Sequence, residues 1–335
     1  MIASIIVLNY QGERIISETI DSLLKLKFPR TDFEIIIADN NSQDNSRQII
    51  DQYVAKYPKL IKTHYMSTNI GFGAGNNEAI KVAKGSYIIL LNNDCLVSPN
   101  WLTNLVKVAD SNQNIFSVTS KIKRYPKKLN QIQNVGSMIF QDGYGRDIGA
   151  IVTKDHQQLY EIDDGQFDQV KEVYSTCGAA ALYRKNILDK IGLFDSNFFM
   201  YYEDTELCER ARLAGYTNFY SSKAVVYHHH AASSGQWSPF FIYHVEKGRL
   251  LHLLFHFPLS VYLSEYFKFA LKSKLRLLRH PKSFTKNFVY VKVAIHLFFN
   301  FPKYYFHRLS FNKTYNPNQR QQNYQKILSG YWYFN

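Results

Sequence analysis

Three apolar runs of the chain end abruptly in clusters of hydrogen-bonding side chains. The clusters that follow residues 2–8, 33–38 and 87–91 begin with Asn9-Tyr10, Asp39-Asn40 and Asn92-Asn93-Asp94. One such ending is usually a turn or a helix cap, but three at the carboxyl ends of parallel strands would meet at one rim of a sheet. There Asp39 could accept a hydrogen bond from a nucleotide base or ribose. Asp94 could coordinate a hard divalent cation that bridges a diphosphate.

Two further groups of side chains could do chemistry. The adjacent carboxylates Glu203 and Asp204 stand at the predicted start of a helix, where they could cap it or supply a general base aimed into a pocket. A histidine triplet, residues 228–230, follows a predicted strand over 224–227. Because adjacent residues of a strand alternate between its two sides, at most one or two of these histidines can reach a given metal ion.

The elements that must position these groups alternate between strands and helices in the first half of the chain. Apolar runs predict strands, and apolar residues at helical spacing predict helices. The expected strands are residues 2–8, 33–38, 61–66, 87–91 and 115–120, and the expected helices are residues 15–26, 44–56, 74–83 and 99–109. This alternation is typical of an α/β protein with a mostly parallel sheet covered by helices on both faces. Ligands of such proteins bind beyond the carboxyl ends of the strands.

The second half of the chain predicts mixed elements and a helical end. Residues 121–170 are polar and turn-rich, which predicts an irregular insertion with a hairpin. After it we expect an apolar run over 175–183, helices from 184 and over 205–214, and a strand over 219–227. From about residue 240 the pattern is helical with breaks at Pro258, Pro281 and Pro302, and the tail after Phe311 predicts a loose end. We therefore divide the chain into an α/β unit, 1–245, and a helical extension, 246–335.

The positive charge of the chain is concentrated in its last quarter. Residues 247–335 hold 15 of the 40 lysines and arginines but one of the 27 acids, Glu265, so the formal net charge of +13 arises there. Bases alternate with aromatic and aliphatic residues at helical spacing, which favours helices lying on an anionic membrane surface. A solvated basic face and a nucleic-acid site are the alternatives, and we expect no nucleic-acid partner.

Composition and short motifs exclude several classes of protein. With 335 residues, 46% of them hydrophobic and 20% charged, the chain is neither disordered nor low in complexity. Three cysteines without a CxxC pair predict neither a disulfide framework nor a cysteine zinc site, and their odd number suits a reducing compartment. Gly71, Gly73 and Gly75 lack the GxGxxG spacing and the position after the first strand that a dehydrogenase requires. We expect neither a secretory signal nor a membrane-spanning helix.

Seven segments occur in the same order as in one known family. They are VLNYQG (7–12), ADNNSQD (38–44), NIGFGAGNN (69–77), LLNND (90–94), GAAALYRK (178–185), FDSNFFMYYEDTELCERARLAGY (194–216) and HHHAASS (228–234). The chain thereby resembles the family 2 inverting glycosyltransferases with the GT-A fold, and most of all the rhamnosyltransferase-like branch that builds O-antigen, capsule and other cell-wall glycans. The resemblance covers about residues 1–250, and the ordered set is more specific than any one segment.

The resemblance implies roles on the nucleotide side of a donor site. Asp39 would recognise the nucleotide base, and the backbone around Asn9 and Tyr10 would line its pocket. The positions near the ribose and diphosphate would be Asn69, Gly73 and Asn76. Gly178 and Ala179 would shape the sugar and acceptor site through close approach of their backbone.

The resemblance also implies a metal site and a catalytic pair. Asn92, Asn93 and Asp94 occupy the position of the family's DxD motif, so Asp94 would bind Mg2+ or Mn2+. Of the histidine triplet, His229 would complete the metal or diphosphate contact. Asp204, in its pair with Glu203, matches the catalytic base.

The implied reaction is a direct displacement at the anomeric carbon of a dTDP-, UDP- or GDP-linked sugar. Asp204 would deprotonate the acceptor hydroxyl, and the metal would neutralise charge on the leaving diphosphate. The branch favours dTDP-rhamnose or a similar hexose as the donor and a lipid-linked or polysaccharide acceptor. The enzyme would be cytoplasmic and peripheral on the inner face of the cell membrane.

Two departures from the family pattern keep alternatives open. The first DxD position is Asn92, a neutral ligand, and Arg249 alone matches an arginine-rich stretch that many members carry after the histidine. One alternative is a non-catalytic nucleotide-sugar-binding protein on the same fold. The other is a sugar-1-phosphate nucleotidyltransferase, but that class should have a glycine-rich loop with Arg and Lys after the first strand, which residues 9–13 lack.

Overall fold

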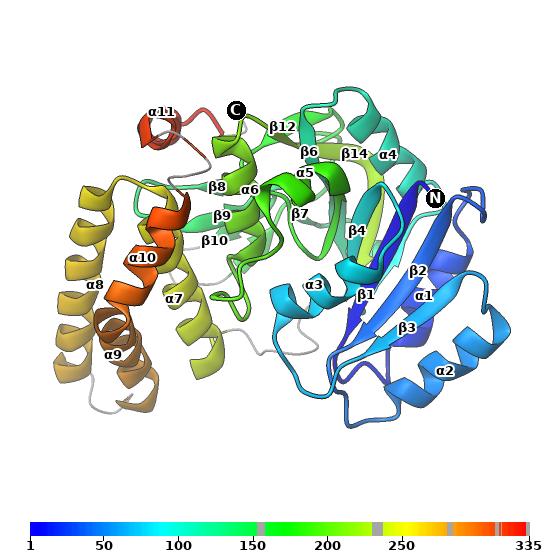
Figure 1. Cartoon of the computed structure of the whole chain (residues 1–335), viewed down its shortest axis with the longest axis horizontal. Coiled ribbons are helices and arrows are strands. Elements are labelled where there is room, and N and C mark those ends of the chain that lie inside the picture. Colours follow the sequence, from blue (N-terminus) through cyan, green and yellow to red (C-terminus); the bar gives the residue numbers. More distant parts are fainter. Residues whose placement is uncertain (153–157, 230–236, 280–283, 312–314, 316, 333–335) are drawn as a thin grey trace.

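A ten-stranded sheet organises the first two thirds of the chain (Figure 1). The computed structural model describes residues 1–152, 158–229, 237–279, 284–311, 315 and 317–332. One half of the sheet is parallel and contains, in spatial order, β4 (Tyr87–Asn92), β1 (Ala3–Asn9), β2 (Phe33–Asp39) and β3 (Ile61–Tyr65). The inner strands β1, β2 and β4 are mostly apolar because both of their faces are covered, whereas the edge strand β3 is largely polar. The predicted α/β class is therefore confirmed.

The other half of the sheet mixes strand directions. Beyond β4 lie, in spatial order, β13 (Ala180–Arg184), β6 (Ile115–Arg124), β14 (Thr217–His228) and β12 (Lys171–Val173). β13 is antiparallel to both of its neighbours, whereas β14 is parallel to β6. The short strand β5 (Cys95–Val97) pairs antiparallel with the end of β14. That pairing brings the segment after β4 next to the histidines.

Helices cover both faces of the sheet. On one face lie α1 (Ile16–Leu24), α2 (Ser46–Lys56) and α4 (Trp101–Asp110), whose side chains Ile20, Ile50 and Trp101 are fully buried. On the other face lie α3 (Phe72–Val82), α5 (Lys185–Ile191) and α6 (Glu203–Leu213). Successive strand residues such as Ile5 and Ile6 enter opposite cores, as the two-residue period of a strand requires.

The insertion over 121–170 is more regular than predicted. It contains the expected hairpin as β8 (Ser137–Ile139) with β9 (Gly145–Asp147), and also a second two-stranded sheet of β10 (Ala150–Val152) and β11 (Gln158–Tyr160). In addition, η1 (Lys127–Leu129) follows β6, and β7 (Ile132–Asn134) extends the main sheet beside it.

Five helices form the C-terminal region. They are α7 (Pro239–His256), α8 (Leu259–Arg279), α9 (Phe284–Phe299), α10 (Phe301–Phe311) and α11 (Pro317–Leu328). Pro258 separates α7 from α8 and Pro302 opens α10, as predicted, whereas Pro281 lies outside the described residues. The prediction of a loose tail after Phe311 was wrong, because α11 packs the buried Ile327 and the following Trp332 into the helical core.

The helical region is continuous with the α/β unit. α7 runs through the proposed boundary at residue 245, and the helical core includes Ile139, Tyr174 and Phe198 from the α/β part of the chain. None of the helices in the described part of the chain has the length and apolar composition that crossing a bilayer requires.

Candidate functional site

The carboxyl ends of β1, β2 and β4 meet at one rim of the sheet. The fully buried side chain of Asn9 donates to Asp39 Oδ2 at 2.8 Å and accepts from Asn93 Nδ2 at 2.8 Å. The polar endings of three strands are thus joined by direct hydrogen bonds. The predicted convergence is confirmed, because parallel neighbours in register end at the same edge.

Asp39 is more constrained than its predicted contact with a base suggests. Its Oδ1 accepts from the Ser42 backbone N–H at 3.0 Å and from Arg47 Nε at 2.6 Å, and the carboxylate is fully buried. A base would therefore have to bind beside Arg47, a residue that the sequence analysis missed. Tyr10, by contrast, is exposed at the same rim.

The turn before α3 brings its backbone close to the segment that precedes α6. Asn69 Oδ1 accepts from Asn40 Nδ2 at 2.9 Å and from the Gly71 N–H at 3.0 Å. Gly71 has a φ of 88°, and a Cβ there would lie 2.3 Å from the carbonyl oxygen of Phe199, so glycine is required. At Gly73, a Cβ would lie 3.0 Å from Phe194 Cβ.

Asn76, predicted to lie near the ribose and diphosphate, is on the second turn of α3. Its side chain is buried and donates back to the Phe72 carbonyl of its own helix at 3.0 Å. Its Oδ1 has no hydrogen-bond partner among the described residues.

Asp94 lies beside a histidine at the end of β14. Asp94 Oδ1 is 3.0 Å from His228 Nε2, and ligand atoms of Asp94, Cys95 and His228 all lie within 4.8 Å of one another. Burial alone would raise the pKa of Asp94, but the hydrogen bond and charge of His228 outweigh it and lower that pKa. A carboxylate kept ionised beside an imidazole is a donor set that fits a divalent metal ion.

The side chain of His228 lies against the Asp94 carboxylate, whereas the predicted His229 reaches Asp94 through its backbone N–H, which donates to the Asp94 carbonyl at 3.0 Å. β14 continues one residue further than predicted, so the buried residues Val226 and His228 share one side of the strand. The His229 ring stacks on Tyr125 with centroids 3.9 Å apart, and its Nε2 is 3.7 Å from Glu18 Oε2. His230 lies outside the described residues.

The carboxylates of Glu203 and Asp204 open α6 in different environments. Asp204 Oδ2 accepts from the Gly178 N–H at 2.8 Å, and Oδ1 accepts from the Thr205 N–H at 2.7 Å. Burial raises the pKa of Asp204 despite these bonds. The buried Glu203 has an Oε2 without a partner among the described residues, and burial together with the charge of Asp204 raises its pKa far more. Both carboxyls are thus harder to ionise than exposed ones, and Glu203 is the harder of the two.

Gly178 and Ala179 connect the carboxylate of Asp204 to the end of β4. The Gly178 N–H holds Asp204, while the Ala179 carbonyl accepts from the Asn92 N–H at 2.9 Å. A Cβ at Gly178 would lie 3.2 Å from the Phe72 ring and 3.4 Å from Asp204 Oδ2. The structure thus brings the predicted base and the end of β4 to a single rim.

Asp147 is a carboxylate of this rim that the sequence analysis missed. It lies at the end of β9 in the insertion and accepts from Ser137 Oγ at 3.0 Å. Burial raises its pKa to about 6, and the charge of Asp204 contributes. No local sequence signal singles it out, because its position depends on how the hairpin folds back onto the sheet.

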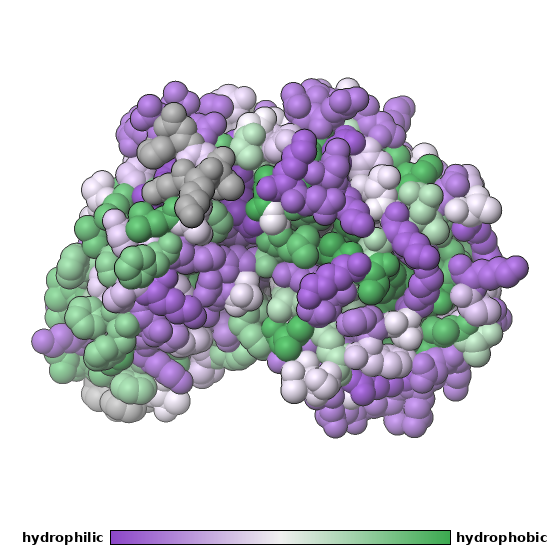
Figure 2. Space-filling model, in the orientation of Figure 1, coloured by the Kyte–Doolittle hydropathy of each residue, from purple (hydrophilic) through white to green (hydrophobic). Residues whose placement is uncertain are grey.

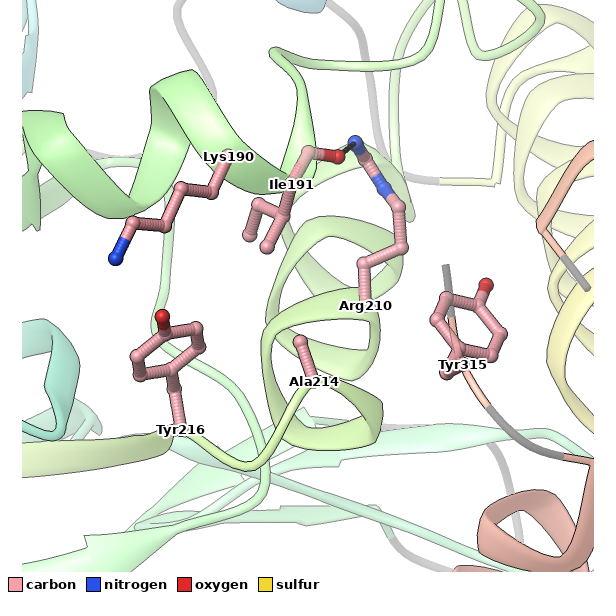
Figure 3. A pocket seen from close by; sticks show the side chains of 6 residues that line it. All are labelled: Lys190, Ile191, Arg210, Ala214, Tyr216 and Tyr315. Atoms are coloured by element: carbon pink, nitrogen blue, oxygen red, sulfur yellow. Dashed lines mark hydrogen bonds between the residues drawn. The ribbon is translucent and has the colours of Figure 1, made fainter. Parts of the chain in front are cut away.

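A pocket of about 190 Å³ lies away from this rim (Figure 3). Lys190, Ile191, Arg210, Ala214, Tyr216 and Tyr315 line it. The Arg210 guanidinium is paired with Glu206, with Nε 2.7 Å from Oε1. The pocket lies at the C-terminal end of α6, whereas Asp204 is at the opposite end of that helix, so we assign it no part in the reaction.

Comparisons with known proteins agree with this geometry. The model of "Glycosyl transferase family 2" matches residues 4–192. The chain is 36% identical over 110 residues to the poly(ribitol-phosphate) beta-glucosyltransferase of Bacillus spizizenii, which covers 33% of this chain and 17% of that protein. It is 26% identical over 217 residues to the O-antigen biosynthesis protein RfbC of Myxococcus xanthus, covering 64% of this chain and 16% of that protein. The chain thus spans about a sixth of the length of these two relatives.

Solved structures share the fold over most of the chain. Residues 1–349 of Staphylococcus aureus TarS superpose with a TM-score of 0.55 at 20% identity, covering 99% of this chain and 91% of that one. GalNAc-T7 superposes with a TM-score of 0.63 at 16% identity, covering 81% of this chain and 51% of that one. At these identities the likeness establishes the fold.

Proposed function

Because the chain belongs to glycosyltransferase family 2 and is a glycosyltransferase, we propose that it moves a hexose from a nucleotide-diphosphate donor to a hydroxyl of a cell-surface glycan or lipid-linked acceptor. The observation that carries this proposal is the position of Asp204. It is a buried carboxylate held by the Gly178 N–H, and one residue along, Ala179 is bonded to the end of β4 that carries Asp94.

In the proposed mechanism, Asp204 accepts the proton of the acceptor hydroxyl as that hydroxyl attacks the anomeric carbon. The Gly178 N–H fixes the orientation of the carboxylate, and the raised pKa makes it a stronger base than an exposed aspartate. Burial and the charge of Asp204 raise the pKa of the neighbouring Glu203, which disfavours a second negative charge in the site. Attack opposite the departing nucleotide inverts the anomeric configuration.

Asp94 and His228 would hold the metal ion. An imidazole beside a carboxylate favours Mn2+ over Mg2+, which takes oxygen ligands. The structures of GalNAc-T7 and of the mannosyltransferase PcManGT from Pyrobaculum calidifontis contain Mn2+. The ion would supply positive charge to the leaving diphosphate.

For the donor we propose a UDP-linked hexose or N-acetylhexosamine ahead of dTDP-rhamnose. TarS has been solved with UDP and with UDP-GlcNAc, and PcManGT with GDP-Man. Two of the curated relatives are named as a glucosyltransferase and an N-acetylglucosaminyltransferase that act on poly(ribitol phosphate). A cell-wall polymer or its lipid-linked precursor is the corresponding acceptor.

Calorimetry of nucleotide binding tests this function. We expect one of UDP, dTDP and GDP to bind at least about tenfold more tightly with Mn2+, a gain of about 1.4 kcal/mol. Asp94→Ala and His228→Ala should abolish that gain. His229→Ala is the matched control and should retain it, since its ring lies on Tyr125. Binding of no nucleotide would contradict the proposal, and pyrophosphate release from UTP and a sugar 1-phosphate would favour the nucleotidyltransferase alternative.

We further propose that α8, α9 and α10 dock on an anionic membrane. They carry six large apolar side chains that are 61–75% exposed: Phe267, Leu271, Leu278, Phe298, Phe299 and Phe306. Figure 2 shows hydrophobic residues interspersed with hydrophilic ones over this part of the surface. Most of the surplus bases of the chain belong to the same helices and their connections. Apolar insertion combined with basic attraction is typical of peripheral membrane helices.

The apolar row of α8 should determine membrane affinity. Replacing Phe267, Leu271 and Leu278 together with serine should weaken binding to phosphatidylglycerol vesicles about 100-fold, since burying each exposed portion contributes about 1 kcal/mol. Leu159→Ser with Val170→Ser is the control, because these side chains are exposed on the insertion. Vesicle sedimentation measures both variants. Equal sedimentation of the α8 variant and the wild type would contradict the proposal.

A further inference from the structure

A set of aromatic rings extends from the catalytic pair along the first turns of α7. Tyr201 packs on Phe241 with centroids 5.0 Å apart at 67°, and Trp237 packs on Phe241 at 5.8 Å and 61°. Phe240 lies against His244 at 4.4 Å. Trp237 and Phe240 are 43% and 42% exposed. We call Tyr201, Trp237, Phe240 and Phe241 the aromatic shelf.

The shelf is connected to both sides of the candidate site. Tyr201 precedes Asp204 by three residues. The Phe199 ring contacts His244 and Phe240 of α7, while its carbonyl accepts from the Phe72 N–H at the start of α3 at 2.8 Å. Phe199 thus bridges α3 and α7, whose facing ends are seen in Figure 1.

The turn that carries Tyr201 is held in an unfavourable conformation. Tyr201 and Tyr202 have φ values of 67° and 69°, and consecutive non-glycine residues in the left-handed region persist only where their surroundings impose it. Tyr202 OH donates to the Gly143 carbonyl at 3.0 Å and accepts from the Gly145 N–H at 3.1 Å. Gly248 lets α7 pack closely against this turn, because a Cβ there would lie 3.0 Å from the Tyr201 carbonyl oxygen.

This strained turn positions both the two carboxylates and the Tyr201 ring. It places Glu203 and Asp204 at the start of α6, and it directs the Tyr201 ring onto Phe241 of α7. Backbone strain of this kind is concentrated at functional sites. The shelf is therefore held in a fixed position relative to the general base.

We propose that the aromatic shelf binds a sugar ring of the acceptor, adjacent to the residue whose hydroxyl attacks. The inference rests on the proposed function and names the chemistry of the acceptor: a glycan with at least one pyranose ring beyond the reacting sugar. The C–H face of a pyranose is apolar and packs on the negative face of an aromatic ring. Rigid exposed Trp and Tyr rings provide such contact area at little cost in conformational entropy.

The environment of Trp237 gives a direct test. Trp101 and Trp332 are buried, so Trp237 is the exposed tryptophan of the described residues and reports on the shelf by fluorescence. We expect cellobiose or chitobiose to change the emission of the wild type, and the change to disappear in Trp237→Phe. Ribitol and dodecyl maltoside are the comparison ligands. A response to the dodecyl chain but to neither disaccharide, or no response to any sugar, would overturn the proposal.

Kinetics give a second readout. Trp237→Ala and Phe241→Ala should raise KM for a glycan acceptor at least about tenfold and leave KM for the nucleotide sugar unchanged, while Trp237→Phe should restore most of the affinity. Leu159→Ala, a side chain 51% exposed on β11, is the control and should change neither constant. An unchanged acceptor KM in both alanine variants would also overturn the proposal. Failure of the proposed function would appear separately, as absent nucleotide binding in calorimetry.

Discussion

Sugar transfer by the Asp204→Asn variant should be about 10³-fold slower than in the wild type, because loss of a positioned general base costs about 10² to 10⁴ in rate. The amide keeps an oxygen that can accept from the Gly178 N–H, so the local fold should survive. In the proposed site the nucleotide lies beside Asp39 and Asp94 and not against Asp204, so nucleotide affinity should change less than about threefold. Radiolabel transfer from the donor into a lipid extract, with calorimetry in parallel, measures the two quantities.

Asp147→Asn is the matched control for this variant, because Asp147 is a second carboxylate of the same rim. It should retain most of the activity. If Asp204→Asn were as active as Asp147→Asn, another group would have to be the base. Thermal melting of both variants separates a catalytic loss from unfolding.

The pH dependence of the wild type should identify the same base. Asp204 acts as a carboxylate, and burial raises its pKa above the ordinary value of about 3.9. The rate should therefore fall as the pH decreases through this raised pKa, and the acid limb should lie above pH 4.

The rim of the sheet could be predicted because its signals are local. Each strand is a continuous apolar run, and each run ends at a polar residue that the structure places at the strand end. Parallel pairing in register places the carboxyl ends of neighbouring strands together. Because β1 pairs with both β2 and β4 in this way, Asn9, Asp39 and Asn92 lie at one edge of the sheet. The hydrogen bonds of Asn9 to Asp39 and Asn93 follow from that placement.

Residues whose roles depend on a single position or on distant contacts were harder to predict. The choice between His228 and His229 depends on whether β14 ends at residue 227 or 228, and one residue reverses the side on which a ring lies. Asp147 reaches the rim from a hairpin, and Arg47 reaches Asp39 from α2. These contacts leave no periodic pattern in the sequence.

The fold of the chain after Phe311 was also not predicted, because it depends on distant contacts. α11 has few apolar residues, so its sequence resembles a linker. It is held by Ile327 in the helical core and by Asn323, whose Nδ2 donates to Glu209 Oε1 of α6 at 2.5 Å across 114 positions of the chain. A contact between residues so far apart in the sequence cannot be predicted from local patterns.

Removing residues 259–335 should prevent the α/β unit from folding stably. Leu250, Leu251, Leu254 and Phe255 of α7 are fully buried within the helical core. Exposing each would cost about 1.5 to 3 kcal/mol, and their sum is comparable to the whole stability of a typical domain, about 5 to 15 kcal/mol. We expect the truncated chain to be insoluble or to melt without cooperativity, as measured by expression and circular dichroism.

The catalytic helix itself depends on the helical region. Glu206 and Glu209, two and five residues after Asp204, are fully buried, and His256 Nε2 lies 2.9 Å from Glu206 Oε1. Burial lowers the pKa of His256, so its neutral ring donates to Glu206 through Nε2–H while Nδ1 accepts from Tyr315 OH at 3.1 Å. Deleting the chain from α10 onward would remove Tyr315 from His256 Nδ1 and Asn323 from Glu209 Oε1, and a buried polar atom that loses its partner costs more than the hydrogen bond itself contributed.

A single substitution in α11 measures this dependence without removing the apolar core. Asn323→Leu should lower the free energy of unfolding by about 1 to 3 kcal/mol, because Glu209 Oε1 loses its donor inside the protein. Gln322→Leu changes the exposed neighbour on the same helix and should alter stability by less than about 0.5 kcal/mol. Two results would show that the α/β unit folds independently of the helical region. One is equal stability of the two variants, and the other is a truncated chain that melts cooperatively and still binds UDP. The expected result makes the helical region part of the catalytic unit, so membrane binding has to be tested with surface substitutions on α8 and not by deletion.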